Sequence, residues 1–535
     1  MTPGGDKSTV RTEREAKLRA PADFTLPDLG DLMPGVIGKA LPEQDLDAVY
    51  YDTADLRLAR FGITVRHRCG EDAPCWTVKF PDPAERGPAL VRSEIEIPGP
   101  RDPLPERVAD LVLAYTRNRS LVPVAALRTR RRPFELRDSA GRGLGQIVDD
   151  EVTATRENFS PYEFREVEVE IGAGGRFGRE LMRAAVTRLE AAGASAGSPI
   201  PKLVRVLGVR ATRPPQVRLV ELAERPSASE LVQHAVARSV TQLLRHDPGV
   251  RLGTDPEDVH QLRVAARRLR SDLRTFAPLL EGEQIDAVRQ ELGWVGRQVG
   301  EVRDADVLGA RLAELCATLP EADRAGAARL LQRHQVQSET AREAMLTSLR
   351  DRRYLRLIDA LVKLAGNPPM RATAMDPNPD SDTPPPAAAM REELAARLVR
   401  RPWRRLKRGV AQLGPDPADE RLHEVRILAK RCRYAAEAVV PVSGRRAERL
   451  ASRMAKVQTV LGDHQDTAVA EDWLRAAAEA DPKARLAAGQ LIAAERARRA
   501  ELRARWPVVW SKASSNAKHP WPEYAHAKKA RTPRR

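Results

Sequence analysis

A charged helical pattern that occurs twice constrains the fold of this 535-residue chain more than any other feature. In the first copy, basic residues follow one another at steps of three and four: His260, Arg263, Arg267, Arg270 and Arg274. At about 100° per residue, these steps place the five side chains on one face of a helix. Apolar residues fall on the opposite face: Leu262, Ala266, Leu269, Leu273 and Phe276. The pattern therefore predicts a helix with one cationic face and one face that packs into a core.

The same spacing returns later in the chain. The second copy carries His423, Arg426, Lys430 and Arg433. A second shared block follows each copy, at residues 299–307 and 461–469, so two blocks recur in the same order and indicate an internal duplication. The second copy departs from the first in three places, with Glu437, Gln465 and Ala468 in place of Arg274, Arg303 and Asp306. We therefore expect the second copy to hold an anion more weakly.

Two interpretations compete for these cationic faces. A solvated helix face explains a single basic helix, but it does not require His and Arg or Lys to return to the same positions twice. Like charges at these spacings repel one another, so an anion would compensate them. Arginine holds phosphate oxygens in pairs, and two such helices side by side would form a basic groove for a polyanion. A metal role for His260 and His423 is disfavoured because the neighbouring arginines would repel a cation.

The composition points to an acidic partner without nucleobases. The formal net charge is +16, whereas aromatic residues make up 4% of the chain. Proteins that bind single-stranded nucleic acid without sequence preference usually stack bases on aromatic side chains, so an inorganic polyanion is favoured over RNA or DNA. No apolar run approaches 18 residues, and the four cysteines suggest neither a disulfide framework nor a zinc site. We expect a cytoplasmic protein that does not enter membranes.

Short segments of the first 208 residues alternate charged and apolar side chains. Glu166, Glu168 and Glu170 alternate with valine and isoleucine, and other segments carry mostly basic residues. A solvated sheet face explains one or two such strands. Several of them favour a barrel with the charged faces inside, where carboxylates would hold Mg²⁺ or Mn²⁺ and basic residues would hold phosphates. Such a site suits metal-assisted phosphoryl transfer to water.

These residues resemble the CYTH domains, the triphosphate tunnel metalloenzymes. Glu13-x-Glu15-x-Lys17 is similar to their ExExK motif, and residues 51–58 are similar to their YFDT segment. The resemblance implies an eight-stranded antiparallel tunnel with Glu13, Glu15 and Lys17 as catalytic residues. The metal ligands it implies are Glu13, Glu15, Glu168 and Glu170. The phosphate-binding residues it implies are Arg66, Arg68, Lys79, Arg130, Arg132 and Lys202. Pro201 replaces a serine of the family's late motif, which leaves the substrate open, and His67 is interpreted as structural.

The rest of the chain is predicted to be helical, beginning at a serine cap after Pro226. Its two halves resemble a CHAD domain, which implies binding of inorganic polyphosphate by the two cationic faces described above. We expect a tunnel domain at 9–208, a linker at 209–226 and a helical domain at 227–505. The helical repeats would span 227–366 and 388–505 with a Pro-rich linker at 367–387, and a disordered basic tail would span 506–535.

The sequence therefore predicts an α+β chain, a β tunnel followed by a duplicated helical bundle. Its predicted function is metal-dependent hydrolysis of inorganic triphosphate or short polyphosphate, with docking on long polyphosphate and localisation at polyphosphate granules. A protein that binds polyphosphate without turnover remains an alternative, as do a nucleoside or thiamine triphosphatase and an adenylate cyclase. The intact Glu13, Glu15 and Lys17 favour an active tunnel.

Overall fold

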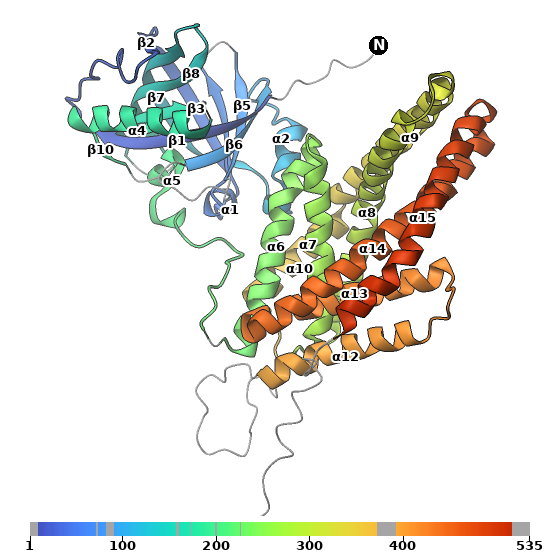
Figure 1. Cartoon of the computed structure of the whole chain (residues 1–535). Coiled ribbons are helices and arrows are strands. Elements are labelled where there is room, and N and C mark those ends of the chain that lie inside the picture. Colours follow the sequence, from blue (N-terminus) through green and yellow to red (C-terminus); the bar gives the residue numbers. More distant parts are fainter. Residues whose placement is uncertain are drawn as a thin grey trace, which may run out of the picture. The chain divides into compact units, whose positions relative to one another are not determined.

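The chain folds into two compact units, Met1–Gln216 and Val217–Arg535. The computed structural model describes residues 9–70, 73–81, 90–156, 160–172, 174–197, 201–224, 226–371 and 392–515. Within these ranges, the side chains of residues 9–13, 90 and 91 lie outside the described part. The first unit contains the strands and the second consists of helices, as Figure 1 shows. The predicted α+β class is confirmed.

The first unit is built on one antiparallel sheet. Its strands are β1 (Thr9–Ala20), β2 (Val36–Ala40), β3 (Gln44–Asp52), β4 (Thr64–Cys69), β5 (Cys75–Pro81), β6 (Leu90–Pro98), β7 (Val122–Asp138), β8 (Gly143–Thr155), β9 (Tyr162–Ile171) and β10 (Ser195–Ala196). Its helices are α1 (Arg57–Arg60), α2 (Glu106–Leu111), α3 (Leu113–Thr116), α4 (Gly175–Ala191), α5 (Lys202–Leu207) and the 3₁₀ turn η1 (Gly208–Arg210).

Strand β1 pairs with two neighbours. Its first half lies antiparallel to β6 and its second half antiparallel to β9. The pairing leads from β1 through β6, β5, β4, β3, β7, β8 and β9, which pairs with β1. Among the described residues, β2 and β10 add to the eight strands of this path, because they pair with β7 and β1 respectively.

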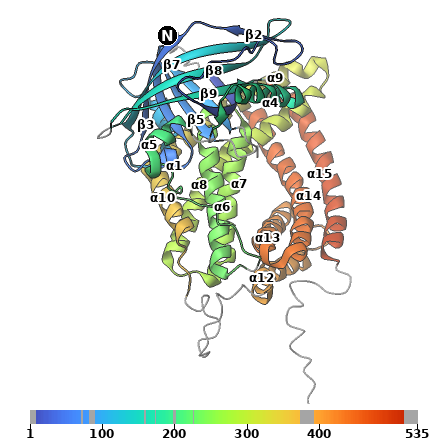
Figure 2. The ribbon, with the colours of Figure 1, turned by 90° about the vertical axis from the view of Figure 1, so that its left-hand side faces the viewer.

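The alternation on β9 separates a core face from a charged face. Val167, Val169 and Ile171 are buried in a core with Leu18 of β1 and Leu181 of α4. Helix α4 lies against β9 and β1, and Figure 2 shows it beside β9. The glutamates between these apolar residues therefore lie on the face of β9 opposite α4.

Helix α5 packs at one end of that charged face. Leu203 and Leu207 of α5 share a core with Ala48 of β3, Leu127 of β7 and Val152 of β8. By the two-residue period of a strand, Leu127 and Val152 lie on the same faces of their strands as Arg131 and Asp150. The charged face is thus apolar where α5 covers it, and α5 brings Lys202 to the charged residues.

The second unit is helical throughout its described part, as predicted. It contains α6 (Ala228–Leu252), α7 (Pro256–Thr275), η2 (Ala277–Leu279), α8 (Glu283–Ala317), η3 (Glu321–Asp323), α9 (Arg324–Arg350), α10 (Arg352–Gly366), α12 (Glu392–Ala411), α13 (Asp419–Ala438), α14 (Val440–Ala480), η4 (Pro482–Ala484) and α15 (Arg485–Ser514). The first helix begins at Ser227, whose hydroxyl accepts a bond from the Glu230 N–H while the Glu230 carboxylate accepts one from the Ser227 N–H. No helix of the described residues is long and apolar enough to cross a bilayer.

The predicted end of the helical region at residue 505 is wrong, because α15 continues to Ser514. Trp506 is buried, and the ring of Trp510 lies 6.1 Å from that of Trp403 on α12, so these aromatic residues hold the last turns against the bundle. Most of the predicted Pro-rich linker (372–387) and of the basic tail (516–535) lies outside the described residues.

Candidate functional site

The charged face of the sheet encloses a cavity of about 240 Å³. Seven cationic side chains line it: Lys17, Arg66, Arg68, Lys79, Arg92, Arg131 and Lys202. Five carboxylates line it as well: Glu15, Glu94, Glu96, Glu168 and Glu170. The cations outnumber the carboxylates, so the cavity suits a ligand that carries several negative charges.

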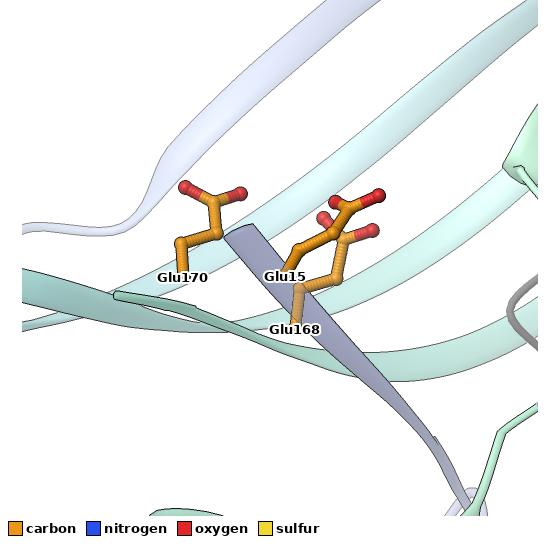
Figure 3. A group of neighbouring side chains, drawn as sticks. All are labelled: Glu15, Glu168 and Glu170. Atoms are coloured by element: carbon orange, nitrogen blue, oxygen red, sulfur yellow. The ribbon is translucent and has the colours of Figure 1, made fainter. Parts of the chain in front are cut away.

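Three of the carboxylates form a cluster where β1 meets β9. Oxygen atoms of Glu15, Glu168 and Glu170 lie within 4.8 Å of one another, and Figure 3 shows their side chains together on the two strands. Glu15 and Glu168 are buried, and Oε1 of Glu15 has no hydrogen-bond partner among the described residues. Clustered carboxylate oxygens with an unsatisfied atom fit a hard divalent cation. The side chain of Glu13, the fourth predicted ligand, lies outside the described part.

Two lysines lie beside this cluster. Nζ of Lys17 contacts Oε1 of Glu168 and lies 3.5 Å from Oε2 of Glu15. Nζ of Lys202 contacts Oδ2 of Asp150 and lies 3.3 Å from Oε2 of Glu168. Burial alone would lower the pKa of each lysine, but these carboxylates outweigh it and raise the pKa of both above its usual range. Both lysines therefore remain protonated, and they hold the pKa of Glu168 well below its usual range despite its burial.

The opposite wall of the cavity is basic. Glu94 lies between two cations, with Oε1 at 3.3 Å from Nζ of Lys79 and 3.6 Å from Nη2 of Arg66. Among the described residues, the buried Nε atoms of Arg66 and Arg92 have no hydrogen-bond acceptor. Buried donors without an acceptor are costly, and phosphate oxygens would satisfy them.

The structure corrects the predicted positions of two phosphate-binding residues on β7. Arg130 and Arg132 do not line the cavity; they bind Glu43 and Glu151 on the outer face. Arg131 lines the cavity instead, and its Nε and Nη2 donate to the two oxygens of Asp150 at 2.9 and 2.8 Å. The prediction assumed that apolar residues of each strand face outward. Leu127 breaks that assumption, because α5 packs on the inner face of β7.

The other predicted phosphate-binding and metal-binding residues whose side chains are described do line the cavity. Glu15, Lys17, Arg66, Arg68, Lys79 and Lys202 all line the cavity with Glu168 and Glu170. His67 is buried away from it, with Nε2 at 3.1 Å from the Gly99 carbonyl oxygen and its ring against Trp76. Arg92, Glu94 and Glu96 also line the cavity, although no role was predicted for them from the sequence. Their alternation with Ile95 and Ile97 on β6 is the pattern that could have placed them on the charged face.

In the helical unit, α7 and α13 bring the two cationic faces together. Nε of Arg267 donates to the Tyr434 hydroxyl at 2.8 Å across the two helices. The five apolar residues predicted to pack, Leu262, Ala266, Leu269, Leu273 and Phe276, are fully buried. Burial and the neighbouring charges of Arg267 and Arg426 lower the pKa of Lys430 to about 7. Burial is the largest cause of this shift, and the neighbouring guanidinium groups add to it while the carboxylate of Asp304 opposes it.

This cationic surface extends along both helices. Burial and the charges of Arg431, Arg289, Arg270 and Arg405 lower the pKa of Arg274 to about 10. Burial and the charge of Arg303 lower the pKa of His260. Residues from α8 and α12 therefore complete a surface that the sequence assigned to α7 and α13. Arg289 and Arg405 carry no motif, so only the fold reveals them.

The second shared block of the duplication lies beside the first arginine of each face. Gly300 of α8 lies next to Arg263, and Gly462 of α14 lies next to Arg426. One turn later, Oδ1 of Asp304 binds Nη1 of Arg263 at 2.6 Å. A Cβ at Gly300 would stand 3.7 Å from the Arg263 guanidinium group, and one at Gly462 would stand 3.4 Å from that of Arg426, which are ordinary contact distances. The repeated block therefore packs against the repeated arginine in both copies.

The second copy differs at its end. Glu437, which stands in place of Arg274, accepts a bond from Nε of Arg433 at 2.7 Å and pairs with Nη1 of Arg268 on α7 at 3.2 Å. Arg433 is therefore partly neutralised, and Glu437 helps to join the repeats through Arg268. His423 is half-buried, and its Nδ1 has no hydrogen-bond partner among the described residues.

Comparison with known proteins identifies both units. Residues 11–202 match the CYTH domain family and residues 234–475 match the CHAD domain family. An uncharacterized protein of Mycobacterium tuberculosis, from strains CDC 1551 and H37Rv, is 34% identical over 451 residues, which cover 81% of this chain and 82% of that protein.

Two solved structures are also similar. PptA from Streptomyces chartreusis is 24% identical and covers 53% of this chain and 99% of its own, with a TM-score of 0.43. The CHAD domain from the plant Ricinus communis is 25% identical and covers 57% of this chain and 98% of its own, with a TM-score of 0.46. From the two family matches and this relative, the chain belongs to the proteins in which a CYTH domain is followed by a CHAD domain.

Proposed function

We propose that the cavity of the first unit hydrolyses inorganic triphosphate, or shortens a short polyphosphate, with Mg²⁺ or Mn²⁺. The observation that supports this most strongly is the presence, in one cavity, of a buried carboxylate cluster and an excess of cations. Glu15, Glu168 and Glu170 would hold the ion. A bound ion would neutralise charge on the phosphoryl oxygens and favour attack by water.

The cations of the cavity would hold the phosphate chain. Arg66, Lys79 and Arg92 form its basic wall, and Lys202 and Arg131 approach from α5 and β7. Because Glu94 already pairs with Arg66 and Lys79, a phosphate group would compete with that carboxylate for the same donors. The raised pKa of Lys202 keeps this residue charged at neutral pH, as electrostatic stabilisation of the transition state requires.

Lys17 has a different part in this proposal. Its ammonium group lies against Glu168 and near Glu15, among the carboxylates that would hold the ion. A divalent cation would compete with Lys17 for Glu168, and the displaced ammonium would become available to a phosphate oxygen. Metal and substrate would then bind cooperatively.

The composition of the cavity favours an inorganic substrate over a nucleotide. Among the described lining residues, Tyr50 is the aromatic one, and its hydroxyl is hydrogen-bonded with Arg66. Adenine or thiamine rings are usually held by stacking on aromatic or apolar side chains, and among the described residues this mostly charged lining offers Tyr50, Pro201 and Leu203 for that purpose. The same reasoning disfavours an adenylate cyclase.

We further propose that the helical unit binds inorganic polyphosphate along the cationic surface of α7 and α13. This surface presents guanidinium groups from both repeats at short spacing, and Asp304 offsets their effect on Lys430 only in part. A chain of phosphates would supply further negative charge repeatedly, which suits a docking surface for a long polymer. Long-chain binding would place the protein at polyphosphate granules.

The test is phosphate release from tripolyphosphate with Mg²⁺ or Mn²⁺, and with EDTA as the blank. The Glu15→Gln/Glu170→Gln variant keeps the side-chain volumes but removes two of the carboxylate charges, and it should lose release. Glu163→Gln, on β9 but exposed outside the cluster, is the matched control and should behave as the wild type. The proposal fails if the wild type releases no phosphate with either metal, and faster hydrolysis of ATP would indicate a nucleoside triphosphatase.

A further inference from the structure

A second cavity of the first unit lies outside the charged cavity and has a volume of about 360 Å³. Four arginines line it: Arg60, Arg119, Arg210 and Arg213. They come from α1, from the segment after α3, from η1 and from the segment that follows η1. Arg60, Arg119 and the pair Arg210 and Arg213 are far apart in sequence, so the fold brings these three parts of the chain together.

The charge of this cavity is poorly compensated. Asp55 is the one carboxylate in the described lining. Its Oδ1 accepts from the Thr53 hydroxyl at 2.8 Å and its Oδ2 from Nε of Arg57 at 3.0 Å, and Arg57 does not line the cavity. Among the described residues, none of the four arginines forms an ion pair with a carboxylate. Arg60 is half-buried, whereas Arg119, Arg210 and Arg213 are exposed, so water screens part of their mutual repulsion. An anion that joined the four guanidinium groups would relieve the rest.

The wall of this cavity is rigid. Residues 53–56 follow β3, and the buried Asp52 carboxylate accepts bonds from the N–H groups of Thr53, Leu58 and Ala59 at 2.6 to 2.9 Å. Leu56 adopts a left-handed conformation with φ 56°, which a leucine tolerates only where its surroundings fix it. This is the Tyr51–Leu58 segment that marks the family in the sequence, and it does not line the first cavity.

Backbone carbonyl groups orient two of the arginines. Nη2 of Arg210 donates to the Ala54 oxygen at 3.1 Å, and Nε and Nη2 of Arg60 donate to the Pro214 oxygen at 2.9 and 2.6 Å. These bonds fix the guanidinium groups without neutralising their charge, and each group keeps further N–H donors. Guanidinium groups held in this way suit the paired oxygens of phosphate groups.

We propose that this cavity is a second oxyanion site, for a compact phosphate-type anion such as pyrophosphate. The site is separate from the carboxylate cluster, so it needs no metal and does not depend on hydrolysis in the first cavity. An anion bound there would bridge α1, η1 and the segment after α3, and would stabilise this end of the unit.

Arginine modification by phenylglyoxal, read residue by residue by mass spectrometry, tests the proposal in the full-length protein. The probe is pyrophosphate in EDTA, so that nothing turns over, at an ionic strength held constant with sodium chloride. Modification of Arg119 and Arg213 should slow by about tenfold when pyrophosphate reaches ten times its dissociation constant. Equal rates with and without pyrophosphate would overturn the proposal, and so would equal protection by chloride alone.

A double variant locates the effect. In Arg210→Gln/Arg213→Gln, pyrophosphate should no longer protect Arg119, whereas protection of Arg131 in the first cavity should persist and show that the unit is folded. Arg142→Gln/Arg176→Gln removes two exposed arginines that do not line this cavity and should leave Arg119 protected. Continued protection of Arg119 in the first double variant would contradict the site.

Discussion

Raising the pH above 7 should weaken polyphosphate binding through a single residue, Lys430. In the free protein, burial and the charges of Arg267, Arg426 and Arg263 lower the pKa of Lys430 to about 7, and Asp304 compensates them only in part. A bound phosphate chain adds negative charge beside the amine and raises this pKa towards its ordinary value. Binding therefore takes up a proton. The contribution of the Lys430 charge to the binding free energy is fully present below pH 7 and is lost as the pH rises.

The size of the effect follows from the two pKa values. If Lys430 is fully protonated in the complex and has a pKa of about 7 in the free protein, affinity should fall roughly 15-fold between pH 7 and pH 8.5. Two other groups of the cationic surface lie outside this range, since the pKa of His260 is lowered and that of Arg274 is about 10. The comparison of the wild type with Lys430→Arg then isolates the part of the slope that comes from the Lys430 amine.

The assay is a titration of long-chain polyphosphate against labelled protein at constant ionic strength, at pH 7.0, 7.5, 8.0 and 8.5. The terminal phosphates of the polymer also change their charge with pH, but they affect every variant alike. The pH profile of the wild type is therefore compared with that of Lys430→Arg, whose side chain stays charged throughout. The arginine variant should show a nearly flat profile, and Lys430→Gln should be flat and weaker. Equal slopes for the wild type and Lys430→Arg would refute the reasoning, because the proton would then be taken up elsewhere.

Three further predictions concern single contacts and stability. Arg131→Gln should lower the rate of triphosphate hydrolysis by about 100-fold, whereas Arg132→Gln on the outer face should change it less than about twofold. Steady-state phosphate release measures both rates, and circular dichroism confirms that both variants fold. Tyr434→Phe removes the acceptor of Arg267 and should weaken polyphosphate binding by about fivefold, measured by the same titration at pH 7. Polyphosphate at 100 times its dissociation constant should stabilise the helical unit by about 2.7 kcal/mol, seen as a rise in its thermal midpoint that sodium chloride of equal ionic strength does not produce.

The helical unit was largely predictable because its signals are local. A 3.6-residue period fixes which residues of α7 face the core, and the buried leucines of that helix confirm it. The duplication indicated that two such faces belong together. Contacts between helices could not be predicted in the same way. Arg289 of α8 and Arg405 of α12 reach the same surface only because their helices pack beside α7 and α13.

The strand unit was predictable in class and less so in detail. Alternation on β9 placed Glu168 and Glu170 on the same face, where they meet Glu15. On β7, three consecutive arginines give no indication of which one faces inward. The answer depends on α5, a later segment that covers Leu127 and so makes part of the inner face apolar. A rule that apolar side chains face outward cannot anticipate such a helix.

Binding of Mn²⁺ tests most directly whether the carboxylate cluster is a metal site. Electron paramagnetic resonance of the free ion, in a titration of the full-length protein in a buffer without phosphates, should show one Mn²⁺ bound per chain. That ion should be lost in Glu15→Gln/Glu170→Gln and retained in Glu163→Gln. Equal Mn²⁺ binding by the wild type and the double variant would contradict the account, since the metal would then lie outside the cluster.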